Sequence, residues 1–126
     1  MNEAELKALH ERCEAAEAMD DTLADAAARM LEDRLDGKLT ARDAKAALLA
    51  GTDGAVTVIG HAYPGWALSF DGHASKAPNT VWRCTLKETR GPDDDQLVGI
   101  GNAKAMPLAL LAAVAHLKMM HMAGYR

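Results

Sequence analysis

Aromatic side chains are scarce in this chain of 126 residues, which contains one phenylalanine, two tyrosines and two tryptophans. Proteins that hold single-stranded nucleic acid usually stack the bases on several aromatic side chains. The scarcity therefore argues against an aromatic platform for nucleic acid. The apolar residues are mainly alanine, leucine and methionine, and a chain of this length can bury roughly two-thirds of its surface in one domain. We expect a single domain over residues 1–126.

Cysteine is also rare, since Cys13 and Cys84 are the only two in the sequence and neither belongs to a Cys-x-x-Cys pair. This spacing excludes the common zinc motifs. A single disulfide is an open alternative, but we expect two reduced, partly buried thiols in a cytoplasmic protein.

Targeting signals and long apolar runs are missing from the sequence as well. Its first residues, "MNEAELKALHERCEAAE", carry a charge every two or three positions, unlike a signal peptide. The most apolar stretch, residues 105–123, contains Pro107, two histidines and Lys118, which a membrane-spanning helix disfavours. We therefore expect a soluble, cytoplasmic protein with no membrane partner.

Positive charge is limited, because 14 lysines and arginines face 18 aspartates and glutamates, giving a formal net charge of −4. The acidity lies in residues 1–50, with twelve acidic and seven basic side chains, whereas residues 51–126 hold six and seven. Proteins that bind nucleic acid normally present a basic surface. Nucleic acid is therefore not the expected partner.

Helix signals are abundant in the first part of the chain, and residues 1–50 predict three amphipathic helices. Asn2 followed by Glu5 forms a capping-box pattern, after which apolar residues recur at helical spacing. Gly37 suits the left-handed residue that often closes a helix. The other helix boundaries are predicted at Asp20 or Asp21, at Asp36–Gly37, at Thr40 with Asp43, and at Gly51.

Residues 51–126 change to the pattern of strands and turns. The β-branched run Ala55–Ile59 predicts a first strand, and alternating segments predict strands over residues 66–70, 80–87 and 96–101. The connections are too short for parallel crossovers, so we predict an antiparallel meander of three or four strands. The expected fold class is α+β, with N-terminal helices, this meander and a long C-terminal helix packed on the sheet.

The C-terminal helix is predicted to start near Pro107, which suits a first helical turn. It is apolar on two sides, so one stripe should cover the sheet while the other packs against the N-terminal helices. The same surplus of apolar surface suggests a homodimer in which this helix or an edge strand meets a second copy. The sheet-covering stripe comprises Leu108, Leu111, Ala112, Ala115, Met119 and Met122, and the second stripe comprises Leu110, Val114 and Leu117.

Several segments resemble the phage ABA sandwich domain, a family of small phage and prophage proteins. The segments are "RCEAAE", "TDGAVTV" with the downstream "PGW", "VWRCTL" and "GNAKAMPLALLAAVAHL", and together they cover most of the chain. The resemblance implies an α/β/α-type sandwich and a phage-derived cytoplasmic accessory protein, with no catalytic residue or cofactor to assign. The segment "GTDGAVTVIGHAYPGW" is longer than its counterpart in the family.

The segment "GIGNAK", residues 99–104, is the best candidate for a binding site. It lacks the glycine that a dinucleotide fingerprint needs where Lys104 stands, and it lacks the Gly-Lys-Ser/Thr of a P-loop. Gly101 and Asn102 instead predict a sharp turn, whose free amides at the start of the last helix suit an anion. Arg83, on the predicted neighbouring strand, could reach the same anion.

The sequence does not predict a metal site or a catalytic site. His116 and His121 are five residues apart and face different sides of a helix, and the other histidines have no ligand partner close in sequence. Acidic residues in a Gly-Pro turn are typical of a solvated loop. We therefore expect no metal, no cofactor and no enzymatic activity. The candidates set aside are His10, His61, His73, His116, His121 and Asp93–Asp95.

Two functional hypotheses follow. In the first, a phage-type accessory protein binds a host protein or protein complex, for instance to inhibit bacterial defence, and its acidic helices compete for a basic partner surface. In the alternative, the protein is a sponge for a nucleotide signal, held by the amides before the last helix and by Lys104 or Arg83.

Overall fold

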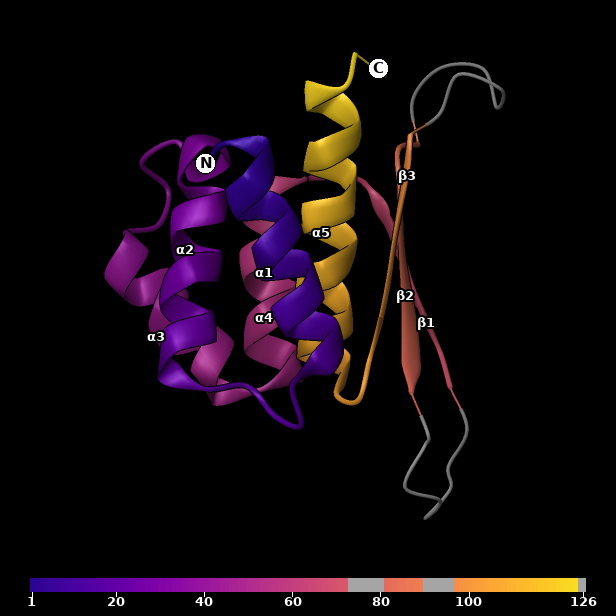
Figure 1. Ribbon diagram of the computed structural model, residues 1–126. Coiled ribbons are helices and arrows are strands. Elements are labelled where there is room, and N and C mark those ends of the chain that lie inside the picture. The colour runs from indigo at the N-terminus through magenta and orange to yellow at the C-terminus, as the bar shows by residue number, and fades with distance from the viewer. Residues whose placement is uncertain (73–80, 90–96, 125–126) are drawn as a thin grey trace.

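The computed structural model describes residues 1–72, 81–89 and 97–124, and Figure 1 shows how the elements are arranged. In chain order, helices come first, followed by strands and a final helix. The elements are α1 (Glu3–Ala15), α2 (Asp21–Leu35), α3 (Ala41–Ala50), α4 (Thr52–Ala62), β1 (Ala67–Asp71), β2 (Trp82–Lys87), β3 (Val98–Ala103) and α5 (Met106–Met122).

The three strands form an antiparallel sheet in the order β1-β2-β3. Helix α5 packs against β3 and β2, and α1 packs against α5 from the other side (Figure 1). The α+β fold class, the antiparallel meander and the packing of the C-terminal helix on it are therefore confirmed. In the part of the chain that the structure describes, the helices lie on one side of the sheet, so α5 is the middle layer and the sheet an outer one.

The predicted helix starts are confirmed by their capping hydrogen bonds. Asn2 and Glu5 form a full capping box, in which the Glu5 amide donates to Asn2 Oδ1 at 2.8 Å and the Asn2 amide donates to Glu5 Oε1 at 3.0 Å. The side chain of Asp20 caps α2, and the side chain of Thr40 caps α3. At the end of α2, Asp36 adopts the left-handed conformation together with the glycine after it.

The predicted strand Ala55–Ile59 is wrong, because these residues belong to helix α4. Their β-branched composition favoured a strand, but the buried positions follow helical spacing rather than alternation. Gly51, with φ of 127°, turns the chain directly from α3 into α4. A Cβ on Gly54 would lie 2.0 Å from the carbonyl oxygen of Ala47, so these helices cross in close contact. The buried residues of α4 are Ala55, Val58, Ile59 and Ala62.

Glycines in β3 allow α5 to approach the sheet closely. A Cβ on Gly99 would lie 2.3 Å from the carbonyl oxygen of Ala113, and one on Gly101 would lie 2.2 Å from that of Ala109. A close backbone approach of this kind is a common reason for glycine in a strand. The contact with these two glycines is made by Ala109, Ala112, Ala113 and Leu117, of which Ala112 alone belongs to the predicted sheet-covering stripe.

Burial of α5 on two sides is confirmed. Leucines of both predicted stripes, Leu110 and Leu111 among them, are completely buried. The N-terminal helices supply the second cover, so this part of α5 is not available to a second copy of the chain. No helix in the described ranges is long and apolar enough to cross a membrane.

Candidate functional site

The residues predicted to hold an anion lie close together, but the predicted turn at Gly101 and Asn102 is wrong. Both residues lie within β3, which continues to Ala103, and neither has a positive φ. The chain turns after the strand, just before α5. Gly101 is needed for the contact with α5 rather than for a bend, which the sequence pattern alone could not distinguish.

Side chains of α1 and its C-terminal extension already bond to this region. Glu14 Oε2 accepts a hydrogen bond from the amide of Asn102 at 3.0 Å, and Glu17 forms an ion pair with Lys104. The guanidinium of Arg83 donates from Nε to Asn102 Oδ1 at 3.1 Å. The anions at the predicted site are therefore carboxylates of the chain itself, which leaves less room for an external anion.

A cluster of polar side chains covers the outer edge of β3. The amide of Ile100 donates to His116 Nδ1 at 3.0 Å, beside the bond between Asn102 and Glu14. His10 Nε2 lies 3.5 Å from Glu14 Oε2, and the rings of His10 and His116 are 6.3 Å apart. Two neighbouring outward amides, those of Ile100 and Asn102, therefore have acceptors, so this part of the edge is not open to a further strand.

The ring of His116 must be neutral to accept this hydrogen bond. Burial, reinforced by nearby His10, lowers the pKa of His116 below its ordinary value of 6.5, although the Glu14 carboxylate acts in the opposite direction. Below pH 6.5 the unfolded chain therefore takes up a proton here more readily than the folded chain. The free energy of unfolding should fall as the pH drops through this range, and the full contribution is present above it.

We expect His116→Asn to reduce this pH dependence, because an asparagine oxygen can accept from the Ile100 amide and does not titrate. The measurement is urea unfolding of both proteins at pH 7.5 and 5.5. The wild type should lose more stability than the variant between these pH values. An equal loss in both would mean that His116 does not contribute.

Burial raises the pKa of the Cys13 and Cys84 thiols to about 12, and both are free and buried as expected. No group of three or more histidine, cysteine, aspartate or glutamate side chains within the described ranges could hold a metal ion. His73 and Asp93–Asp95 lie outside the described residues.

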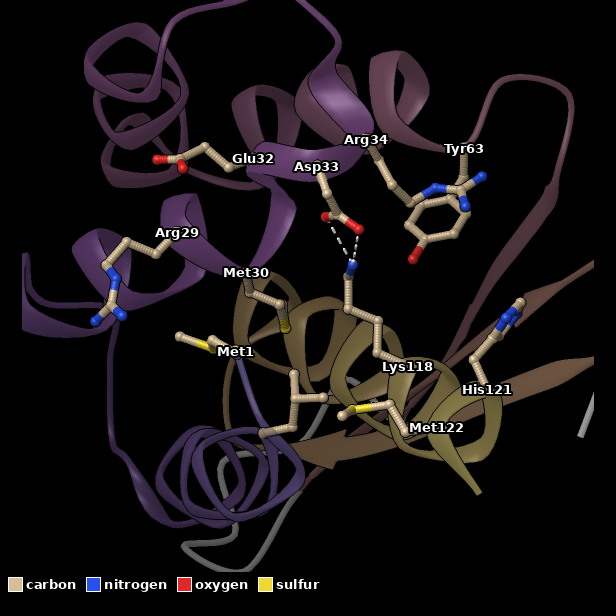
Figure 2. Close-up of a pocket in the computed structure, with 11 residues that line it drawn as sticks. Met1, Arg29, Met30, Glu32, Asp33, Arg34, Tyr63, Lys118, His121 and Met122 are labelled. Atoms are coloured by element: carbon tan, nitrogen blue, oxygen red, sulfur yellow. Dashed lines mark hydrogen bonds and ion pairs between the residues drawn. The ribbon is translucent and has the colours of Figure 1, made fainter. Parts of the chain in front are cut away.

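A pocket of about 550 Å³ opens at the other end of α5, among the C-terminal half of α2, the end of α4 and the start of α1 (Figure 2). Its walls are partly apolar and partly charged. The apolar lining residues are Met1, Leu6, Met30 and Met122, and the polar ones are Arg29, Glu32, Asp33, Arg34, Tyr63, Lys118 and His121.

Two pairs of side chains define the polar part of the pocket. Lys118 Nζ donates to both carboxylate oxygens of Asp33, at 2.8 and 3.0 Å, so their charges offset each other. The guanidinium of Arg34 lies over the ring of Tyr63, 4.0 Å from its centroid, and Arg34 Nε donates to the carbonyl oxygen of Ala62 at 2.8 Å. Such stacking on an aromatic face holds the cation in place.

The hydroxyl of Tyr63 points into the pocket, toward the pair of Lys118 and Asp33 (Figure 2). Burial is the main cause that raises the pKa of Tyr63 to about 12; Arg34 opposes the shift, and Asp33 adds to it. The phenol therefore keeps its proton and can donate a hydrogen bond. Trp66 packs edge-on against the Tyr63 ring, with the ring centroids 5.0 Å apart, and fixes its orientation further.

The pocket could not be predicted from the sequence, because its residues come from four separate helices and their end regions. Tyr63 lies between two predicted strands, and nothing in the sequence pattern assigns a role to Arg34. One signal was present: Lys118 is the charged residue that interrupts the apolar C-terminal segment. A half-buried cation of this kind often has a charged partner or a ligand.

Comparisons with protein-family models, with curated proteins and with solved structures find no match for this chain. The resemblance to the phage ABA sandwich domain therefore stays a prediction. Proposals about function rest on the geometry described above.

Proposed function

We propose that this protein is a non-enzymatic binding protein whose pocket holds a small amphipathic anion. The ligand would have an apolar body and a carboxylate, sulfonate or phosphate head. One observation carries the proposal: the Tyr63 side chain, in a residue only 3% exposed, directs its hydroxyl into the pocket. Within the described residues this hydroxyl has no hydrogen-bond partner, whereas buried hydroxyls normally have one. An acceptor atom in the head group of a ligand would provide the hydrogen-bond partner of this hydroxyl.

The charges around Tyr63 favour a negative head group. Arg34 has no carboxylate of the described residues within ion-pair distance, although its guanidinium is held in place. Lys118 is offset by Asp33, so Arg34 supplies the net charge near the phenol. A planar guanidinium stacked on the ring that carries a hydroxyl donor suits the oxygens of a carboxylate or phosphate.

The opposite wall of the pocket suits an apolar body. Met30 and Leu6 are almost completely buried, and the more exposed Met122 lies at the opening. Methionine side chains adapt to ligands of different shape. A pocket lined by apolar side chains with a few convergent polar groups is the usual form of a small-molecule site.

The proposal is tested with two probes that share one alkyl chain, decanoate and decyltrimethylammonium, by isothermal titration calorimetry. We expect decanoate to bind about tenfold or more tightly than the cation. Arg34→Gln should weaken decanoate binding by about tenfold, and Tyr63→Phe, which removes a single hydroxyl, by a smaller factor.

Arg42→Gln is the matched control, because Arg42 is exposed on α3 away from the pocket and the substitution is chemically identical. Thermal unfolding of each variant shows whether it is folded. Equal affinity for the two probes in the wild-type protein would contradict an anion site, whatever the stability of the variants. Unchanged decanoate binding by folded Arg34→Gln would do so as well.

The resemblance to the phage ABA sandwich domain suggests a phage-derived accessory role, and a ligand-binding pocket is compatible with such a role. A protein that sequesters a nucleotide signal would bind a ligand of the same class, with the nucleotide phosphate as the anionic head group. The pocket, rather than the segment before α5, is then the site that we propose for it. The carboxylates of Glu14 and Glu17 already occupy that segment.

Binding of a host protein, with inhibition of bacterial defence as an example, is the second candidate. The observation that favours it is the outer face of the sheet, which no described helix covers and on which Arg83 and Lys87 are exposed. The acidic helices support it less, since Asp21 and Asp33 form ion pairs within the chain. A pull-down from host lysate should yield a stoichiometric partner that Arg83→Glu loses. Recovery of the same partner by that variant would count against this face.

A further inference from the structure

The two edges of the sheet differ in how their backbone groups are used. On β3, the amides of Ile100 and Asn102 are bonded to side chains of α5 and α1. On β1, the described residues provide no such cover, and β1 pairs with β2 alone. A free edge without proline, inward charge or covering side chain is a template for another strand.

The register identifies which groups of β1 face outward. The amide of Glu88 donates to the carbonyl of Leu97 at 2.9 Å, so the even-numbered residues of β2 bond to β3. In an antiparallel sheet, the backbone groups of successive residues point to alternate sides of the strand. The odd-numbered residues of β2 therefore bond to β1, and Thr85 bonds to Ser69 opposite it. The backbone groups of Leu68 and Phe70 therefore point to the open edge.

We propose that β1 pairs with β1 of a second copy, antiparallel and centred on Ser69, so that two sheets join into one of six strands. This register opposes Leu68 to Phe70 of the partner subunit and Phe70 to Leu68 of the partner subunit, which satisfies all the outward groups of both residues. It also engages the whole of β1. A dimer through β1 would involve neither the pocket nor its ligand.

In this register, the apolar side chains of β1 lie opposite apolar side chains of β1 in the second copy. Leu68 and Phe70 are half-buried on the face that carries Leu86, while α5 packs on β3 and β2. Pairing adds an apolar neighbour to each of them. A second copy is therefore a better occupant than a polar segment would be.

Charge on the outer face agrees with the same register. Lys87 is opposite Ala67 within the chain, and Ala67 would be opposite Asp71 of the partner subunit. Neighbouring strands are about 5 Å apart, so the backbones of Lys87 and this aspartate would be roughly 10 Å apart. Because alanine is small, the lysine can extend across it to the carboxylate. The two-fold symmetry gives this pair twice.

A cysteine scan tests the register. Ser69 would face its own copy as a pair without mutual backbone hydrogen bonds, the type in which side chains come closest. Ser69→Cys should form a disulfide-linked dimer under mild oxidation, which non-reducing electrophoresis detects. Thr85→Cys, on the same face of the inner strand β2, is the matched control and should not. The native cysteines are buried and should not interfere.

Light scattering tests association without cysteine. The wild type should approach the dimer mass at concentrations of about 100 µM, as expected for a small interface. Asp71→Lys should weaken the dimer by about tenfold, and adding Lys87→Asp should restore it by exchanging the charges. A monomer mass at this concentration, or cross-linking of Ser69→Cys no faster than that of Thr85→Cys, would overturn the proposal.

Discussion

Replacing Gly101 with alanine should lower the free energy of unfolding by about 3 kcal/mol. The added Cβ would lie 2.2 Å from the carbonyl oxygen of Ala109 and 2.4 Å from the amide nitrogen of Ala113. Both atoms belong to the backbone of α5, so no side chain can rotate away and the helix has to move off the sheet. Gly101 has no positive φ, so strain in its own backbone does not add to the effect.

Gly60→Ala is the matched control for this substitution. Gly60 is exposed within α4, and a Cβ there would meet no atom within 4 Å. Alanine is the better helix former, so this variant should gain about 0.5–1 kcal/mol. Urea unfolding of both variants measures the contrast. A Gly101→Ala protein within about 0.5 kcal/mol of the wild type would contradict the close contact between β3 and α5.

Leu110→Ala and Leu111→Ala should each cost about 2–5 kcal/mol. Both leucines are completely buried although they belong to different stripes of α5, and each truncation leaves a cavity between packed layers. Leu49→Ala provides the control, because Leu49 is 43% exposed on α3 and its loss should change stability by less than about 0.5 kcal/mol. A surface-like effect at Leu110 would mean that α5 is not the middle layer.

The elements that local sequence predicts best are the helices with capping residues. Asn2, Asp20 and Thr40 bond to amides three residues away, so both partners stand in one short stretch of sequence. The three strands were likewise predicted within a few residues of their positions in the structure.

Helix α4 shows where local composition misleads. Val56, Val58 and Ile59 raise the strand propensity, yet tertiary packing overrides it, because two of these side chains reach the core on a helix. In a strand, Val56 and Val58 would lie on the same face, yet Val56 is exposed and Val58 is buried. Because residues 55–59 were predicted to form a strand, Tyr63 was not predicted to lie at the end of a helix.

The two glycines of β3 show a different difficulty. A glycine pair before a helix is compatible with a turn and with a close approach of two backbones. Only the position of α5 distinguishes the two, and that position depends on the packing of the whole chain. The pocket depends on the same packing, since Arg34, Tyr63 and Lys118 are brought together by three different helices.

The methionine methyl groups provide the most direct test of the proposed function. The sequence has seven methionines; Met30 and Met122 line the pocket, whereas Met19 and Met106 lie outside its lining. With carbon-13 methyl labels, decanoate should shift the NMR signals of Met30 and Met122 progressively and leave those of Met19 and Met106 in place. Equal shifts of all methyl signals, or no shift of Met30 with decanoate in excess, would contradict the pocket as the binding site.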